Sequence, residues 1–245
     1  MQVRKKCVVE YDGSNFFGWQ RQKNLRTVQQ VIEDALSKIY KTEIKIVGSG
    51  RTDTGVHALG QVFHFSASRY LENMSVLMGL NSMLPDDVVI KKVEDVGYNF
   101  HAQKSAKNKT YLYKIYNQPI RSAIYRNRAW WIKEELNVEK LKELMNCFVG
   151  VKDFSAMCLK RSVPENPVRK INFIKISKED VFVNIEINAD GFLHNMVRNI
   201  VGTVIDIYLD KGGVAKIRKI LESRDRSQAG RTAPPHGLYL KEVFY

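Results

Sequence analysis

The spacing of apolar residues predicts helices and strands that alternate along the chain. Apolar residues recur every three or four positions between residues 28 and 40, which indicates an amphipathic helix. The same spacing predicts helices at about 73–84, 137–148, 192–209 and 214–223. Apolar runs and alternating patterns predict strands at 7–11, 43–50, 61–67, 88–96, 109–117, 168–177, 181–189 and 238–245. Together these elements predict a protein of the α+β class.

Two of the predicted helices begin at residues that are suited to capping. Thr27 is followed three positions later by Gln30, which is the pattern of a capping box. Asn137 stands at the start of the helix predicted at 137–148, and asparagine side chains accept hydrogen bonds from the first free N–H groups of a helix. We therefore expect side-chain caps at both positions.

Strands and helices follow a similar order in the two halves of the chain. We therefore expect two similar halves, each made of a sheet and helices, at residues 1–105 and 106–245. No sequence repeat relates the halves, and no low-complexity linker separates them. This favours two halves that share a central cleft over two independent domains. A length of 245 residues suggests one large domain or two intimately packed ones.

The charge of the chain indicates a polyanionic partner. Lysine and arginine outnumber aspartate and glutamate by 39 to 26, which gives a net charge of +13. Residues 106–245 hold 25 basic and 15 acidic side chains, whereas residues 1–105 hold 14 and 11, so the excess lies in the second half. Basic side chains bind phosphates and release the counterions around them. The alternative is a generally basic protein that has no such partner.

Basic and aromatic residues interleave in the middle of the chain, as is typical of an RNA-binding groove. The basic residues are Lys104, Lys107, Lys109, Arg121, Arg126 and Arg128, and the aromatic ones are Tyr111, Tyr113, Tyr116, Tyr125 and Trp130. Each charge taken singly is also compatible with an ordinary solvated surface.

The three cysteines and the apolar segments indicate a cytoplasmic protein. Cys7, Cys147 and Cys158 are odd in number and far apart, which argues against a disulfide framework. No apolar stretch approaches 18 residues, and the N-terminus has no signal-peptide pattern. We therefore expect a protein of a reducing compartment that does not span a membrane.

The stretch GSGRTDTGVHALG, residues 48–60, carries the strongest candidate chemistry. Glycines surround Arg51, Asp53 and His57, and predicted strands lead into and out of this loop. A cation beside a carboxylate favours its ionised form, and an ionised, oriented carboxylate can act as a nucleophile. A plain solvated turn is the main alternative. A metal site needs more ligands than Asp53 and His57, so we expect none, and His57 suits a structural role.

Five stretches in the same order resemble the TruA-type tRNA pseudouridine synthases. They are YDGS with FGWQ (11–20), GRTDTGVHA (50–58), FHA with TYLY (100–113), GFLHNMVRNIVG (191–202), and TAPP with GLYL (232–240). The resemblance implies two ferredoxin-like halves around a central basic RNA-binding cleft. It also implies a homodimer that isomerises uridine to pseudouridine at positions 38, 39 and 40, in the anticodon stem-loop of tRNA.

The resemblance assigns a role to individual residues. Asp53 matches the nucleophile, and Arg51 matches the residue that displaces the flipped base. Tyr111 matches the tyrosine that packs on the target uracil, and Arg198 matches the arginine that pairs with the nucleophile. Lys109 stands where relatives often have arginine, so a bidentate phosphate contact is lost there.

Physical arguments support two of these assignments. An aromatic face compensates for the cost of unstacking a base, because base–aromatic stacking contributes about 1–3 kcal/mol. Tyr111 suits that task, although a tyrosine on a strand is also an ordinary core residue. Arg198 lies opposite the apolar stripe of its predicted helix, and Gly202, four residues later, predicts a close approach by another segment of backbone. A solvated arginine on a surface helix is the alternative.

The implied reaction breaks the N1–C1′ bond of uridine and forms a C5–C1′ bond. It involves no redox change and adds no external group, so we expect no cofactor and no metal. A non-catalytic RNA-binding protein is the principal alternative, and a metal-dependent phosphoesterase is disfavoured by the sparse Asp and His clusters.

Overall fold

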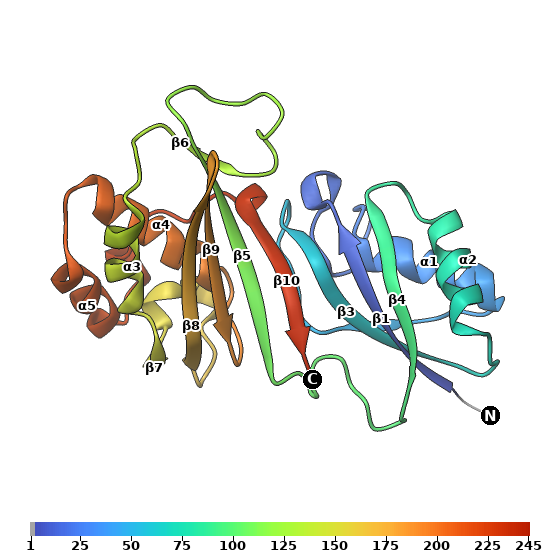
Figure 1. Ribbon diagram of the computed structural model, residues 1–245. Coiled ribbons are helices and arrows are strands. Elements are labelled where there is room, and N and C mark those ends of the chain that lie inside the picture. The colour runs from blue at the N-terminus through green and yellow to red at the C-terminus, as the bar shows by residue number, and fades with distance from the viewer. Residues whose placement is uncertain (1–2) are drawn as a thin grey trace. The chain divides into compact units, whose positions relative to one another are not determined.

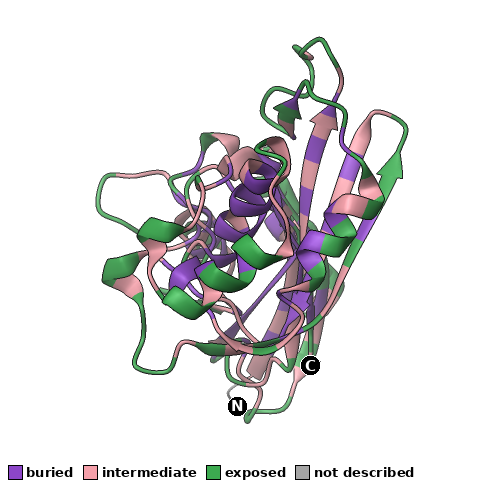
Figure 2. Cartoon of the chain, turned by 90° about the vertical axis from the view of Figure 1, so that its left-hand side faces the viewer, coloured by how far each residue is buried: buried purple, intermediate pink, exposed green. Residues whose placement is uncertain are grey.

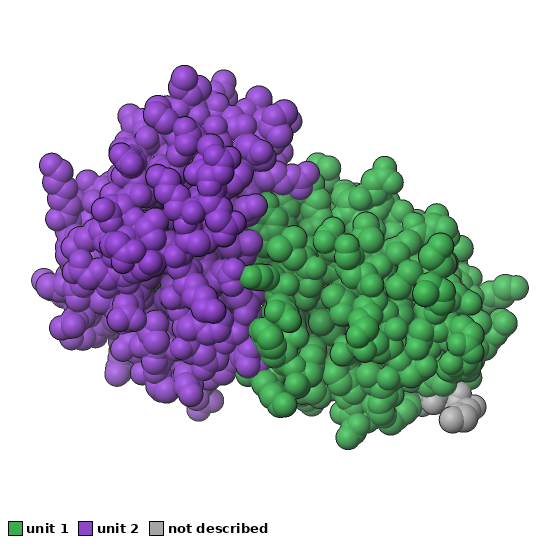
Figure 3. Space-filling model, viewed as in Figure 1, with its two compact units in different colours: residues 1–107, 239–245 green, residues 108–238 purple. Residues whose placement is uncertain are grey.

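The computed structural model describes residues 3–245 and confirms the predicted α+β class, with ten strands and five α-helices in that part of the chain (Figure 1). Two compact units are present (Figure 3). The first extends to Lys107 and includes Tyr239–Tyr245, and the second is Asn108–Leu238. The predicted division after residue 105 places residues 239–245 in the second half, which is wrong, because the last strand pairs with a strand of the first unit.

The first unit has the β-α-β-β-α-β order of the ferredoxin-like motif. Its elements are β1 (Val3–Tyr11), α1 (Val28–Tyr40), β2 (Ile46–Gly48), β3 (His57–Ala67), α2 (Asn73–Met83) and β4 (Val88–Val96), with β10 (Leu238–Phe244) added. β1 lies between β3 and β4 and is antiparallel to both. β2 is antiparallel to β3, and β10 is parallel to the start of β3. Both helices lie on one side of this sheet (Figure 1).

Helix α1 has the predicted bounds but a different cap. Thr27 occupies the N-cap position, yet its side chain makes no cap hydrogen bond, so the predicted capping box is wrong. Instead, the Val28 N–H donates to the Gly18 carbonyl at 3.2 Å and the Gln29 N–H donates to the Trp19 carbonyl at 3.0 Å. The FGWQ stretch therefore satisfies two of the four free N–H groups with which a helix begins.

The second unit is a sheet with three helices on one side (Figure 1). Its elements are β5 (Asn108–Asn117), β6 (Trp130–Ile132), α3 (Val138–Asn146), β7 (Gly150–Asp153), β8 (Val168–Glu179), β9 (Phe182–Ala189), α4 (Met196–Leu209) and α5 (Val214–Ser223). The order is β5-β9-β8-β7 with antiparallel neighbours, and β6 is parallel to β5. Asn137 caps α3 as predicted, because its side chain accepts the Lys140 N–H. The short strands β6 and β7 were not predicted.

Short 3-10 helices complete the described secondary structure, at Gly13–Asn15, Ser155–Met157, Lys160–Ser162, Arg226–Gln228 and Pro235–Gly237. Among the helices of residues 3–245, none is long and apolar enough to cross a membrane.

Helix α4 is buried along most of its length (Figure 2). It begins at Met196 rather than at the predicted residue 192, because Asn195 adopts a left-handed conformation with φ of 62°. A Cβ atom at Gly202 would collide with the carbonyl oxygen of Arg231. The predicted close approach of backbone at Gly202 is therefore confirmed, and the approaching segment is residues 231–233.

Candidate active site

Residues 49–56, here called the Asp53 loop, connect β2 to β3, as the strand pattern predicted. Arg51 is exposed, Thr52 is buried and Asp53 is half-buried. Arg51 and, in part, Asp53 are therefore exposed to solvent, while Thr52 between them is buried in the interior. Such a loop on a rigid scaffold is a common place for reactive groups.

The main chain of the Asp53 loop packs on residues 11–19. The Trp19 N–H donates to the Thr52 carbonyl at 3.1 Å, and the Gly55 N–H donates to the Phe16 carbonyl at 3.4 Å. Gly18 has φ of +84°, and a Cβ atom there would lie 2.6 Å from the Thr52 oxygen. Only glycine combines that left-handed conformation with so close a contact. The YDGS and FGWQ stretches thus support the loop.

His57 has the structural environment that we expected. Its ring is 1% exposed, and Nδ1 accepts the Gly13 N–H at 3.1 Å and lies 3.0 Å from an Asp12 carboxylate oxygen. The ring also stacks on Tyr239, with 4.6 Å between the ring centroids. Across residues 3–245, no three His, Cys, Asp or Glu side chains are grouped so that they could hold a metal ion.

Tyr111 and Lys109 lie two positions apart on β5, opposite Ile187 and Ala189 of β9. The Tyr111 side chain is 9% exposed, and its ring meets that of Phe192 edge to face at 4.9 Å. Lys109 is half-buried, and this burial lowers the pKa of its amine below the ordinary value.

Arg198 lies in the first turn of α4, and its side chain is fixed by neighbouring oxygens. Nε donates to the Ala233 carbonyl at 2.8 Å, and Nη1 donates to Asn195 Oδ1 at 3.0 Å. The Ala233 N–H in turn donates to the Arg198 carbonyl at 3.0 Å. The TAPP stretch is therefore bonded to α4 at Arg198, and the solvated surface arginine that we considered as an alternative does not describe this side chain.

Two further residues lie within the electrostatic reach of Arg198. Tyr113 was expected only as one aromatic residue of an RNA-binding groove, and His236 was not identified at all. Burial raises the pKa of Tyr113 well above its ordinary value, and the Arg198 charge opposes this rise. Burial lowers the pKa of His236, and the Arg198 charge lowers it further. The Tyr113 hydroxyl donates to the Pro234 carbonyl at 2.9 Å. His236 lies directly between the TAPP and GLYL stretches, and this position in the sequence could have identified it.

The predicted site residues fall into two sets. Arg51 and Asp53 share one loop of the first unit, whereas Lys109, Tyr111 and Arg198 belong to the second unit. The pairing of Arg198 with Asp53 stays a prediction.

Part of the predicted basic and aromatic region forms a cavity of about 300 Å³ in the second unit. The cavity is lined by Tyr116, Arg121, Ser122, Tyr125, Arg126, Ala129, Trp130, Trp131 and His236, none of which is acidic. Guanidinium groups beside aromatic faces are suited to phosphates and bases. Residues that are distant in the sequence, such as Trp130 and His236, line it together.

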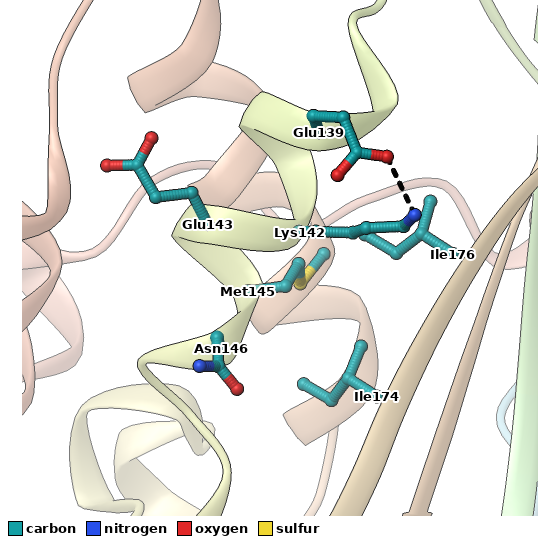
Figure 4. A pocket seen from close by; sticks show the side chains of 7 residues that line it. All are labelled: Glu139, Lys142, Glu143, Met145, Asn146, Ile174 and Ile176. Atoms are coloured by element: carbon teal, nitrogen blue, oxygen red, sulfur yellow. Dashed lines mark hydrogen bonds and ion pairs between the residues drawn. The ribbon is translucent and has the colours of Figure 1, made fainter.

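A second cavity, of about 430 Å³, lies between α3 and β8 and has a different chemistry (Figure 4). Glu139 and Glu143 line it beside Lys142, and the Lys142 amine lies 2.8 Å from Glu139. The negative charges of these two carboxylates repel phosphates, so binding of a polyanion such as RNA is disfavoured there. Of the two cavities, the one with Arg121 and Arg126 is the better candidate for RNA contact.

The loop with its accessible carboxylate and the basic, aromatic cavity together favour an enzyme that acts on a nucleic acid. A family model described as tRNA pseudouridine synthase matches residues 7–103 and 144–245. The chain belongs to the tRNA pseudouridine synthase family.

Relatives of similar length support this assignment. The chain is 44% identical over 240 residues to tRNA pseudouridine synthase A of Acetivibrio thermocellus, covering 98% of each chain. It is 44% identical over 238 residues to the protein of the same name from Thermoanaerobacter sp., covering 97% of this chain and 98% of that one. It is also 41% identical over 240 residues to tRNA pseudouridine synthase A 2 of Clostridium perfringens, covering 98% of each.

Proposed function

We propose that the chain isomerises uridines at positions 38, 39 and 40, in the anticodon stem-loop of tRNA. Family membership establishes the general activity: the chain is an isomerase that converts uridine to pseudouridine in tRNA. The observation that carries the proposal is the partly exposed Asp53 in a supported loop, within the GRTDTGVHA stretch and inside the range that the family model matches. The exact positions rest on the resemblance to TruA-type enzymes.

Asp53 is the reacting carboxylate of this proposal. Attack on C1′, addition to the base and abstraction of a ribose proton all require an ionised carboxylate beside the flipped nucleotide. Once the N1–C1′ bond breaks and the C5–C1′ bond forms, N1 gains a proton and C5 loses one, so the reaction is balanced without a cofactor. Arg51 lies two residues earlier and is exposed, and in this proposal it displaces the target base.

The second unit supplies the remaining roles. Tyr111 packs on the uracil, and its contact with Phe192 orients the ring for stacking. Arg198 supplies a fixed positive charge for Asp53, because its guanidinium is already oriented by Ala233 and Asn195. Lys109 contacts a phosphate through a single point charge.

The cavity with Arg121 and Arg126 contributes to RNA binding in this proposal. Each phosphate that a basic side chain neutralises adds to the salt dependence of binding. We also propose that two chains form a homodimer, that each tRNA contacts both subunits, and that the protein is cytoplasmic. The mass in solution tests the dimer, since one chain has a mass of 28.3 kDa.

One experiment tests the activity and the positions together. The pure protein is incubated with unmodified tRNA transcripts, and pseudouridine is mapped by carbodiimide-block sequencing. The matched control transcript carries cytidine at positions 38, 39 and 40. We expect blocks at these positions in the first transcript only. Tight, salt-dependent binding without any new pseudouridine would instead support the non-catalytic RNA-binding alternative.

A further inference from the structure

We propose that the hydroxyl groups of Tyr11 and Thr52 form a positioning pair that sets the direction of Asp53. Thr52 is the residue directly before Asp53, and its hydroxyl lies 2.7 Å from the hydroxyl of Tyr11. The inference rests on the proposed role of Asp53. It assigns Tyr11 and Thr52 a role in the reaction although neither contacts the substrate.

The two hydroxyl groups are in a protected environment. Tyr11 is 3% exposed and Thr52 is 7% exposed. A hydrogen bond inside a protein is stronger than one in water, and a buried polar group that loses its partner is costly. The pair also connects distant parts of the chain, because Tyr11 ends β1 and Thr52 belongs to the loop before β3. It therefore fixes the loop to the sheet of the first unit.

The backbone contacts of Thr52 also hold the Asp53 loop in place. Its carbonyl accepts the Trp19 N–H at 3.1 Å, so the residue is held at both its side chain and its main chain. On the other side of the reacting residue, the Asp53 carbonyl accepts the Val56 N–H at 3.1 Å. Hydrogen bonds therefore fix the backbone on both sides of Asp53. The Asp53 carboxylate then keeps its accessibility while its backbone has little freedom.

Such positioning matters for rate more than for affinity. A displacement of about 1 Å from the productive geometry lowers a rate by up to about 100-fold. Binding of tRNA, by contrast, depends on many phosphate contacts spread over the protein surface. Loss of the hydroxyl pair is therefore expected to lower the rate of the chemical step and to leave tRNA affinity nearly unchanged.

The test compares Thr52→Val, Thr52→Ser and Tyr11→Phe in single-turnover reactions with excess enzyme. Thr52→Val removes the hydroxyl at nearly constant shape, and we expect its rate constant to fall about 10- to 100-fold. Thr52→Ser keeps the hydroxyl and should stay within about threefold of wild type. Tyr11→Phe should resemble Thr52→Val, and the double variant should be no slower than the slower single variant, because both remove one interaction.

Ser37→Ala is the matched control for a simple loss of stability. The Ser37 hydroxyl accepts the Ile44 N–H at 3.0 Å in the same unit but outside the Asp53 loop. This variant should lower the melting temperature and leave the single-turnover rate unchanged. If Thr52→Val is as fast as wild type, or if Thr52→Ser is as slow as Thr52→Val, the positioning role is wrong.

Amide hydrogen exchange tests the same pair without relying on activity. Thr52→Val should speed exchange at the Val56 N–H, which is bonded to Asp53, and Thr52→Ser should not. Unchanged exchange in Thr52→Val would overturn the inference. A wild-type protein that binds tRNA but makes no pseudouridine would contradict the proposed function instead, and the exchange measurement would still decide whether the hydroxyl pair fixes the loop.

Discussion

The Asp53 loop and the first turn of α4 each carry a charged residue of the proposed reaction, but they fix it differently. In the loop the main chain is fixed, because Thr52 bonds to Trp19 and packs on Gly18. The side chain of Asp53 stays half-exposed. In α4 the side chain itself is fixed, because the Arg198 guanidinium bonds to Ala233.

This difference agrees with what each group has to do. A carboxylate that reacts must reach the substrate, so a fixed backbone with an accessible side chain is suitable. A guanidinium that acts through its charge works best when it is oriented in advance. Substitutions that disturb the loop should therefore lower the reaction rate in addition to the free energy of unfolding. Substitutions that disturb α4 should mainly lower the free energy of unfolding.

The largest effect is expected from Gly202→Ala in α4. The new Cβ atom would collide with the Arg231 carbonyl, so residues 231–233 must move away from the helix and both bonds between Arg198 and Ala233 are disturbed. We expect a loss of about 4 kcal/mol in the free energy of unfolding, measured by urea denaturation. Gly213→Ala is the control, because a Cβ atom there meets nothing within 4 Å. Equal stability of the two variants would contradict the packing described.

Gly18→Ala should have the next largest effect, and of a different kind. The residue has φ of +84°, and the new Cβ atom would lie 2.6 Å from the Thr52 oxygen and 3.2 Å from the Asp53 carbonyl carbon. We expect a loss of about 3 kcal/mol in the free energy of unfolding. The single-turnover rate of the folded variant should also fall by about tenfold or more. A folded variant with the wild-type rate would contradict the claim that disturbing the Asp53 loop, unlike disturbing α4, lowers the rate directly.

The fold was predictable where the pattern of apolar residues is long and regular. The bounds of α1 and α5 agree with the prediction because their buried residues recur with helical spacing. The start of α4 was predicted four residues too early, since the apolar residues before it continue the pattern although Asn195 is left-handed. Strands β6 and β7 were missed because they have only three and four residues, which is too few for a recognisable alternation of apolar and polar positions.

The candidate site was predictable as a set of motifs but not as a set of contacts. The sequence identified the Asp53 loop and the close approach at Gly202, because glycine has few other reasons to occur in a helix. It did not reveal that Gly18 and Trp19 cap α1 and also contact Thr52, because these contacts join residues that are distant in sequence. The hydroxyl pair of Tyr11 and Thr52 was missed for the same reason.

Arg198→Met should have a moderate effect on stability. Methionine fills a similar volume but leaves the Ala233 carbonyl and Asn195 Oδ1 without the bonds that the guanidinium donates to them. We expect a loss of about 2 kcal/mol in the free energy of unfolding, together with a lower single-turnover rate. Arg198→Lys keeps the charge and should retain more activity than Arg198→Met. Equal rates in the two variants would show that the charge of Arg198 does not matter to the reaction.

The smallest expected effect is a loss of stability in mild acid that originates in the first unit. Burial lowers the pKa of His64 from 6.5 to about 4, and its Nδ1 accepts the Ala102 N–H. Between these two values the unfolded chain binds more protons than the folded one, so stability falls as the pH falls. We expect this residue to contribute a loss of about 1–2 kcal/mol between pH 7 and pH 5, measured by urea denaturation. His64→Asn should show a smaller pH dependence, and an unchanged dependence would exclude His64 as its source.

The most direct test of the account is the single-turnover reaction of Asp53→Asn on an unmodified tRNA transcript. Asparagine preserves the volume and much of the hydrogen bonding of aspartate, but it is neither an effective nucleophile nor a general base. The account predicts a rate at least about 10³-fold below that of wild type, with tRNA affinity within a few-fold. Isomerisation by Asp53→Asn at a rate close to wild type would contradict the assignment of the Asp53 loop as the reacting site.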